Sequence, residues 1–278
     1  MQIIAISDTH GKHRDVELPR GDVLVHAGDF TVGGEKSATL DFVNWFSVQP
    51  FEHKLFIAGN HDLWAESHEE ELTSYANEQG VHYLCNSAVE IAGLTFWGSP
   101  QTPRFMDWAF MYSPGGEAES QWNQVPESVD VLVTHGPPKG ILDGLYVAPD
   151  PGLNSSGDFG AGVTNAVKSS PYSRLQSVGC DALAKRIMQV KPRLHLFGHI
   201  HEAFGSMNVG RTQFVNASVM DRHYKLANPP HHLDVSDVVK SGNVTSNDFS
   251  DKVHGEEKLP NGVKGVNDVG EFVLDPVG

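Results

Sequence analysis

The chain has little cysteine, and this absence narrows the kinds of site it can build. Its 278 residues include two cysteines, Cys85 and Cys180, which lie far apart and form no C-x-x-C pattern. Such spacing argues against a disulfide framework and against an all-sulfur structural zinc site. We expect both residues to be reduced, buried thiols.

Positive charge and long apolar runs are also scarce. Twenty Lys and Arg residues stand against 35 Asp and Glu residues, for a formal net charge of −15. A chain of this charge lacks the basic surface that binds long nucleic acids. No apolar run approaches the ~20 residues of a membrane span, and no basic segment with a long apolar stretch opens the sequence. We therefore expect a cytoplasmic protein with neither a membrane nor a long nucleic acid as partner.

What the chain does contain is a series of short apolar runs, each followed by polar residues. Five such runs of strand type end at clusters of Asp, Asn or His. The clusters are Asp8-Thr9-His10, Gly28-Asp29, Gly59-Asn60-His61-Asp62, Thr134-His135-Gly136 and Gly198-His199-Ile200-His201. Continuous apolar runs are typical of buried strands in α/β proteins, and ligands bind where those strands end.

The residue types in these clusters indicate a metal site. Carboxylate, imidazole and amide groups without thiolate suit Mn, Fe, Co, Ni or Zn. Two cations held close together need a shared carboxylate, and Asp29 is the candidate because it is the only ligand in its cluster. The sequence therefore predicts a centre with two metal ions.

These motifs carry a family resemblance. The series resembles the calcineurin-like metallophosphoesterase superfamily over residues 1–235, and within it the metallophosphoesterase-domain-containing phosphodiesterases. Further matching stretches are Trp97-Gly98-Ser99-Pro100, Val178-Gly179-Cys180 and Val215-Asn216-Ala217-Ser218. The resemblance implies a four-layer α/β/β/α sandwich of two mixed sheets flanked by helices.

The resemblance also implies a ligand set and a proton donor. It assigns Asp8, His10, Asp29 and His201 to the first metal, and Asp29, Asn60, His135 and His199 to the second. His61 matches the position that protonates the leaving group, and we expect Asp62 to orient His61 by a hydrogen bond.

The predicted elements alternate between strands and helices, with several hairpins. We expect a hairpin over 88–92 and 94–98, another over 204–217, strands at 2–7, 22–27, 53–58, 81–84, 129–134 and 193–197, and helices at 35–48, 65–79 and 178–190. Residues 1–235 form the predicted domain.

Two segments differ in composition from this domain. Residues 143–173 are rich in Gly, Ser, Pro, Asn and Asp and leave the His135 loop, so they are either a lid over the site or a surface insertion. Residues 236–278 contain few large apolar side chains and are expected to be a largely irregular tail, with 271–274 as a candidate edge strand.

The predicted function is a dinuclear metal-dependent phosphoesterase that hydrolyses small phosphodiesters, including cyclic nucleotides, by attack of a metal-bridging hydroxide. Alternatives are a phosphomonoesterase or protein phosphatase, a metal centre recruited for other chemistry such as natural-product processing, and a non-catalytic scaffold. The substrate, the native metal pair and the oligomeric state stay open.

Several further residues are candidates for contributing to the site. Phe105, Trp108 and Phe110 could stack on a base or aryl group, although ordinary packing is the simpler interpretation. His26 and His195 lie inside apolar runs and are expected to be core residues or to support the ligands. Basic candidates for steering a phosphate are Lys12, Arg14, Arg104 and Lys139.

Overall fold

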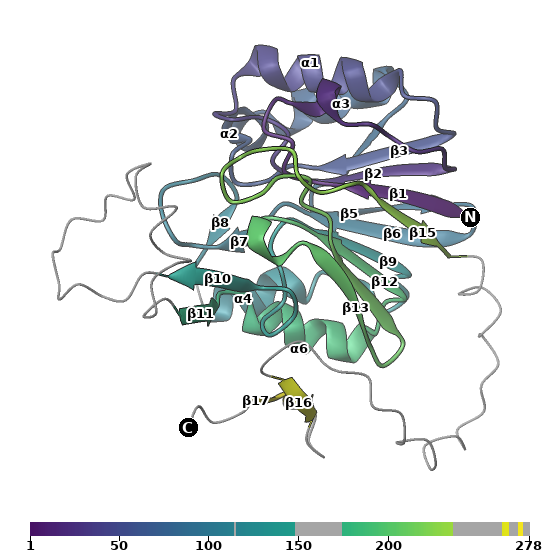
Figure 1. Cartoon of the computed structure of the whole chain (residues 1–278). Coiled ribbons are helices and arrows are strands. Elements are labelled where there is room, and N and C mark those ends of the chain that lie inside the picture. Colours follow the sequence, from purple (N-terminus) through teal and green to yellow (C-terminus); the bar gives the residue numbers. More distant parts are fainter. Residues whose placement is uncertain (114, 148–173, 236–262, 267–271, 275–278) are drawn as a thin grey trace, which may run out of the picture. The chain divides into compact units, whose positions relative to one another are not determined.

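The chain divides into two units, Met1–Ser236 and Asp237–Gly278. The structure is a computed structural model that describes residues 1–113, 115–147, 174–235, 263–266 and 272–274 (Figure 1). Each unit is described separately below.

The first sheet of the larger unit contains five strands in the order β15-β1-β2-β3-β4. Strands β1 to β4 run parallel, and β15 pairs antiparallel with β1. The strand bounds are Gln2–Ile6 (β1), Val23–Ala27 (β2), His53–Ile57 (β3), His82–Tyr83 (β4) and His231–Asp234 (β15). All five residues of β2 are buried, as expected for a central strand covered on both faces.

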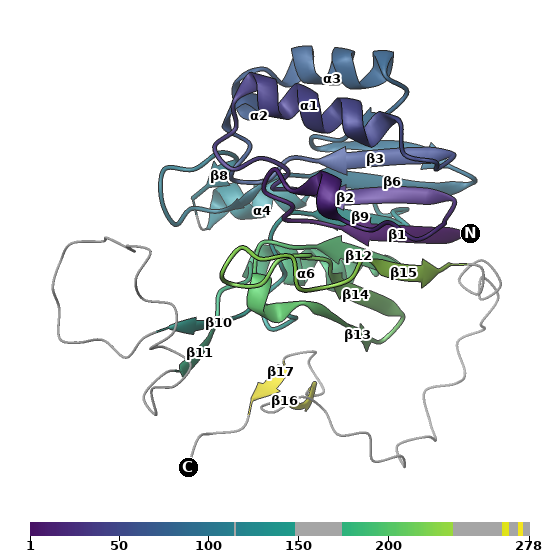
Figure 2. The same ribbon diagram turned by 45° about the horizontal axis from the view of Figure 1, so that its top comes forward.

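Helices cover the outer face of this sheet (Figures 1 and 2). They are α1 (Lys36–Ser47), α2 (Leu63–Ser67) and α3 (Glu69–Glu78), with a short 3-10 turn, η1, at His13–Asp15. Helix α1 turns Phe42, Val43 and Phe46 toward the sheet, and all three are fully buried. Phe42 stacks on Phe30 with ring centroids 4.3 Å apart, so helix, strand-end loop and sheet share one aromatic core.

The second sheet contains six strands in the order β13-β14-β12-β9-β6-β5. Helices α4 (Gly116–Trp122) and α6 (Asp181–Val190) lie on its outer side (Figure 1), and a 3-10 turn, η2 (His201–Ala203), follows β12. The strand bounds are Ser87–Ile91 (β5), Leu94–Ser99 (β6), Val131–Thr134 (β9), Leu194–Phe197 (β12), Gly205–Val209 (β13) and Thr212–Asn216 (β14).

The two sheets pack closely between the helical layers. A Cβ on Gly98 of β6 would lie 2.7 Å from a methyl carbon of Ile57 of β3, so only glycine allows the sheets this approach. Hydrogen bonds from Ser7 to Ala217 and from Val219 to Ser7 also join the end of β1 to the chain after β14. The predicted four-layer α/β/β/α sandwich is confirmed.

Some element boundaries differ from the prediction. The helix expected over 65–79 is two helices, because His68 leaves the helical conformation with φ −135°. Helix α6 begins at Asp181 and not at 178, because the sulfur of Cys180 caps it by accepting a hydrogen bond from the Leu183 backbone. Strand β15 was not predicted at all. It follows a Pro-Pro pair and contains two histidines, so it lacks the apolar run that marked the other strands.

Small paired strands complete the described structure of the larger unit. Strand β7 (Thr102–Pro103) pairs with β8 (Met111–Tyr112), and β10 (Gly144–Val147) pairs with β11 (Arg174–Ser177). The latter pair lies at the two ends of the predicted 143–173 insertion, whose residues 148–173 are outside the described residues.

The predicted irregular tail lies mostly outside the described residues. Its described parts, β16 (Val263–Val266) and β17 (Phe272–Leu274), pair with each other. Within the described ranges, every helix is too short or too polar to span a lipid bilayer.

Candidate metal centre

Both sheets deliver polar side chains to the same place. The loops after β1, β2 and β3 carry Asp8, Asp29 and Asn60, and those after β9 and β12 carry His135, His199 and His201. Among the described residues, three groups have potential ligand atoms within 4.8 Å of one another. The groups are Asp8, His10 and His201; His10, Asp29 and His61; and Asp29, His135 and His199.

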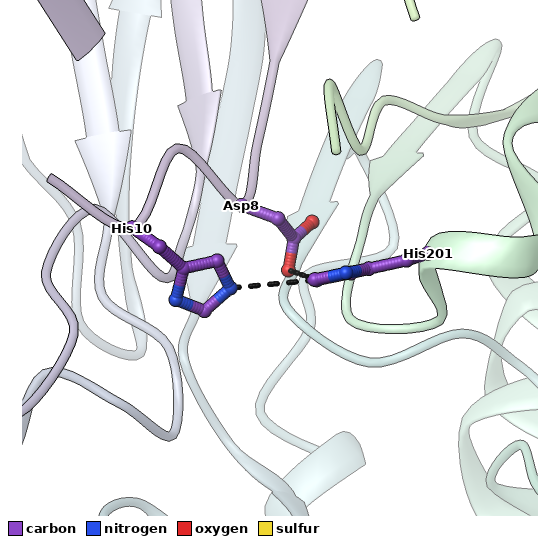
Figure 3. A group of neighbouring side chains, drawn as sticks. All are labelled: Asp8, His10 and His201. Atoms are coloured by element: carbon purple, nitrogen blue, oxygen red, sulfur yellow. Dashed lines mark hydrogen bonds and ion pairs between the residues drawn. The ribbon is translucent and has the colours of Figure 1, made fainter. Parts of the chain in front are cut away.

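In the first group, two imidazole nitrogens face each other. His10 Nε2 lies 3.4 Å from His201 Nε2, which is also 3.4 Å from Asp8 Oδ1 (Figure 3). The other ring nitrogen of His10, Nδ1, lies 3.2 Å from the carbonyl oxygen of Thr31. Nδ1 of His201 lies 3.0 Å from the carbonyl oxygen of Asp221. A carbonyl only accepts, so both Nδ1 atoms carry the hydrogen, and in neutral rings both Nε2 lone pairs point at the same space. Two lone pairs and a carboxylate converging in this way fit a cation.

The third group shows the same convergence, with an amide added. His135 donates from Nδ1 to the carbonyl of Ala27 at 2.9 Å. Its Nε2 then faces Asn60 Oδ1 at 3.0 Å and Asp29 Oδ2 at 3.3 Å. All three facing atoms are acceptors in the neutral state, so a cation or a proton must lie among them. The structure therefore brings together all seven predicted ligands.

Asp29, the predicted shared carboxylate, belongs to two of the three groups. Its Oδ2 is 3.3 Å from His135 and 3.8 Å from His10, while its Oδ1 accepts the backbone N–H of His61 at 2.8 Å. Burial raises the pKa of the Asp29 carboxyl, but the neighbouring His135 outweighs burial and holds that pKa well below its usual range. A carboxylate that stays ionised while buried can neutralise cations on two sides.

The pKa values of His135 and His10 are shifted in opposite directions, although both side chains are close to Asp29. Burial lowers the pKa of His135, but Asp29 outweighs burial and raises it to about 9. For His10, burial dominates and lowers the pKa to about 4. In the metal-free chain, a proton on His135 thus balances a charge that a metal cation would otherwise neutralise.

Asp62 does not orient His61, contrary to our expectation. The ring of His61 is held by its Nδ1, which donates to the Val32 carbonyl at 2.7 Å. The Asp62 carboxylate instead accepts hydrogen bonds from backbone N–H groups of Asp29, Thr31 and Gly59. Consecutive residues in the tight turn point to different sides, so Asp62 joins the loop after β2 to the loop after β3. It is a positioning residue for the ligand loops.

Asp8 is held in a similar way by its surroundings. Its carboxylate accepts the backbone N–H of His199 and the hydroxyl of Ser7. A Cβ on Gly198 would overlap the Asp8 carboxylate, and a Cβ on Gly59 would overlap that of Asp29. Glycine at these two positions therefore lets Asp8 approach the loop that carries His199, and Asp29 the loop that carries Asn60.

Two buried histidines support the ligand loops. His26 on β2 accepts the Gly28 N–H at Nδ1, so its Nε2 donates to Thr9 between Asp8 and His10, at 3.0 Å. The hydroxyl of Thr134 donates to the Gly136 carbonyl and so accepts from His195 Nε2 at 2.8 Å. This agrees with the expectation that His26 and His195 lie in the core or support the ligands.

Aromatic side chains surround the centre. The ring of Trp108 lies 4.3 Å from that of His61, and Phe105 lies 5.6 Å from His199. Tyr224 contacts His10 at 4.9 Å and His201 at 5.1 Å between ring centroids. Sequence reasoning missed Tyr224, because its loop after β14 has neither periodicity nor a recognisable motif. Phe110, by contrast, is buried and packs in the core.

Comparison with known proteins identifies the family. A model described as "Calcineurin-like phosphoesterase" matches residues 1–203. Human "Metallophosphoesterase domain-containing protein 1" is 35% identical over 256 residues, covering 84% of this chain and 71% of that protein. The "UPF0046 protein C25E10.12" of Caenorhabditis elegans is 32% identical over 253 residues, covering 84% of this chain and 81% of that protein.

A solved structure agrees at the level of the fold. The crystal structure of TT1561 of Thermus thermophilus has a TM-score of 0.50 at 13% sequence identity, covering 80% of this chain and 90% of that chain. Taken with the converging ligand groups, the family match shows that this chain belongs to the calcineurin-like phosphoesterases and is a metal-dependent phosphoester hydrolase.

Proposed function

We propose that this chain is a phosphodiesterase that uses two metal ions. Support for two ions comes from the sharing of ligands: His10 belongs to the first and second groups, and Asp29 to the second and third. Two neighbouring cation positions would require such shared ligands. Two bound cations would neutralise Asp8 and Asp29, polarise a phosphoryl group and acidify water.

His61 is the proposed proton donor to the leaving group. Its Nδ1–H is engaged by the Val32 carbonyl, which leaves Nε2 as the atom that can hand over a proton. The ring is partly exposed and lies between His10, at 4.6 Å, and Trp108. The leaving group must reach this nitrogen, so it also lies beside the indole of Trp108.

The observation that supports a preference for diesters is that the basic side chains near the motifs already have protein partners. A monoester dianion has nearly one more negative charge than a diester and needs an additional positive group. Each basic candidate near the motifs is already engaged. Lys12 donates to the Tyr224 carbonyl, and the other three pair with carboxylates: Arg14 with Asp41, Arg104 with Asp107 and Lys139 with Asp181.

The rim of the site also favours esters with apolar substituents. Eight large hydrophobic side chains are exposed among the described residues, and five of them belong to residues that follow a site residue in the chain or contact one. Phe105 is 51% exposed and Tyr224 47% exposed. Exposed aromatic side chains beside a site offer apolar contact surface to a substrate. Aryl esters and nucleotides, including cyclic nucleotides, have flat groups that fit aromatic walls. The five are Val32, Leu63, Phe105, Met106 and Tyr224.

One observation favours the phosphomonoesterase alternative. No ion pair engages Arg222 within the part of the chain that the structure describes, and Arg222 lines a hollow next to His201. If its guanidinium reached the phosphate, it would supply the extra positive charge that a monoester needs.

The test is kcat/KM for matched substrates at saturating metal. Bis(4-nitrophenyl) phosphate is compared with 4-nitrophenyl phosphate, and 2′,3′- and 3′,5′-cyclic nucleotides with the corresponding monophosphates. We expect the diester of each pair to be preferred. A monoester preference of tenfold or more, about 1.4 kcal/mol in transition-state free energy, would contradict the proposal. Chelator-treated protein serves as the control for metal dependence.

A further inference from the structure

A hollow of about 360 Å³ lies beside the metal centre. One of its walls is His201, whose Nε2 faces Asp8 and His10. A group bound in the hollow would therefore be one side chain away from the proposed first metal. This inference rests on the proposed function and concerns the part of the substrate that occupies the hollow.

The leaving group belongs elsewhere. It must lie beside His61 and hence beside Trp108 to receive its proton. Neither His61 nor Trp108 lines the hollow, whose walls come from η2 and the loop after β14. The substituent that stays on phosphorus is the part of a diester left to fill it.

Charged groups of both signs, Arg222 and Glu202, line the hollow. Arg222 donates from Nε to His223 Nε2 at 3.2 Å, which leaves its terminal amino groups for a ligand. Glu202 also lines the hollow, and within the described residues no ion pair joins it to Arg222. The carboxylate of Asp221 is occupied by the backbone N–H groups of His223 and Lys225.

A cation and a carboxylate in one small hollow fit a ligand edge that both accepts and donates hydrogen bonds. A guanidinium binds acceptor atoms, often two at once, and a carboxylate binds N–H donors. A purely anionic group would satisfy Arg222 but would be repelled by Glu202. The rings of Phe204 and His223, also in the lining, offer flat apolar surfaces to a planar group.

We propose that this hollow binds the substituent retained on phosphorus, and that this substituent is a neutral planar group with a hydrogen-bond acceptor and a donor on one edge, as in an amide or a nucleobase. Arg222 donates hydrogen bonds to the acceptor on that edge, and Glu202 accepts one from the donor. The two residues therefore determine specificity and take no part in bond cleavage.

The test uses diesters that share one leaving group. The three substrates are 4-nitrophenyl esters of phenyl, 3-carbamoylphenyl and 3-carboxyphenyl phosphate, in which nitrophenolate leaves and the second aryl group is retained. For the wild type we expect kcat/KM for the carbamoyl substrate to exceed that for the phenyl substrate about tenfold or more, mainly through KM, because hydrogen bonds to charged groups are strong. The carboxyl substrate should fall between them.

Variants of the hollow test which residues cause the preference for the carbamoyl substrate. Arg222→Ala should reduce the carbamoyl-to-phenyl ratio to below about threefold. Glu202→Gln should raise the carboxyl substrate relative to the phenyl substrate, because it removes the repulsion. Lys225→Ala is the matched control: it removes an exposed cation three residues from Arg222 that does not line the hollow, and it should leave the ratios unchanged. Arg222→Gln repeats the test if the alanine variant fails to fold.

A wild-type ratio near one, or a ratio that survives Arg222→Ala, would overturn the inference. A chain that hydrolyses none of the three diesters would contradict the proposed function and not the hollow. In that case, calorimetric titration of the metal-loaded chain with phenyl phosphate and with 3-carbamoylphenyl phosphate tests the hollow. We expect a lower Kd for the carbamoyl compound in the wild type, and loss of this difference in Arg222→Ala.

Discussion

The two sheets of the larger unit contribute different chemistry to one centre. The loops of the first sheet supply both carboxylates, Asp8 and Asp29, together with His10 and Asn60. The loops of the second sheet supply imidazoles alone, from His135, His199 and His201. Negative charge therefore comes from one side and orientable neutral ligands from the other, so a complete centre requires the sheets to be packed together.

The sheets nevertheless use the same supporting device. In each, a buried histidine on a strand neighbouring a ligand-bearing strand donates to a threonine next to a ligand: His26 to Thr9 and His195 to Thr134. The difference in the ligands that the two sheets supply and the similarity of their histidine–threonine hydrogen bonds can be tested separately.

Asp29→Ala should have the largest effect, because both ions lose their shared carboxylate. We expect metal to be lost from both positions and turnover to be abolished. Metal analysis per chain and a diester assay measure this. Glu78→Ala removes an exposed carboxylate at the end of α3 and serves as the control. Two metals per chain in active Asp29→Ala would show that the first sheet does not hold the bridging charge.

Replacement of His61 by Ala should spare the metals and slow hydrolysis roughly 10²–10⁴-fold, the usual range for a positioned proton donor. The loss should be smaller for esters of acidic phenols, whose oxygen needs little protonation. The measurement is kcat across a series of leaving groups, with metal content determined in parallel. Equal slowing for good and poor leaving groups would reject His61 as the proton donor. Loss of one metal would instead identify His61 as a metal ligand, which its position near His10 and Asp29 allows.

His201→Gly sharpens the contrast between the sheets. A single imidazole of the second sheet serves one position, so we expect one ion to be weakened while the other persists at Asn60, His135 and His199. The rate should fall without being abolished. Anomalous scattering from crystals of the wild type and the variant counts the ions. A single ion in fully metallated wild-type protein would contradict the assignment of two positions.

His195→Gln tests the supporting device through pH and gives the smallest expected effect. Burial lowers the pKa of His195 from 6.5 to about 3. Between these values the unfolded chain binds a proton that the folded chain does not, so this histidine's contribution to stability is complete above pH 6.5 and is lost as the pH falls. The loss at pH 5 is about 2 kcal/mol. Glutamine can still donate to Thr134 but does not titrate, so denaturant unfolding at pH 7 and pH 5 should show a smaller drop. Equal drops in both proteins would refute this account.

The positions of the ligands could be predicted from the sequence because they depend on chain-local patterns. An apolar run predicts a buried strand, and a ligand directly after it must lie at the strand's end. Asp29 was chosen as the shared carboxylate on another ground, as the only potential ligand in its cluster, and the structure places it in two of the three groups. Chain-local reasoning failed for Asp62, where adjacency to His61 in the chain did not translate into side-chain contact.

Features built by loops were beyond such reasoning. Tyr224 reaches the centre, and Arg222 the neighbouring hollow, only because the chain after β14 folds back. The Asp221 carbonyl accepts a hydrogen bond from His201, and the Asp221 carboxylate accepts one from its own turn. No periodicity marks a turn of this kind, and its position depends on contacts between residues distant in the chain. Strand β15 was missed for a related reason: its place beside β1 is decided by pairing and not by its own composition.

Four proposed ligands have left-handed backbone conformations: Asp8 at φ 55°, His10 at 40°, Asp29 at 57° and His199 at 68°. Side chains other than glycine are strained there by about 1 kcal/mol each, although Asp and His tolerate it better than most. Glycine at any of these positions would relax the backbone while destroying a ligand. The ligands, and not the fold, therefore require this backbone conformation at the strand ends.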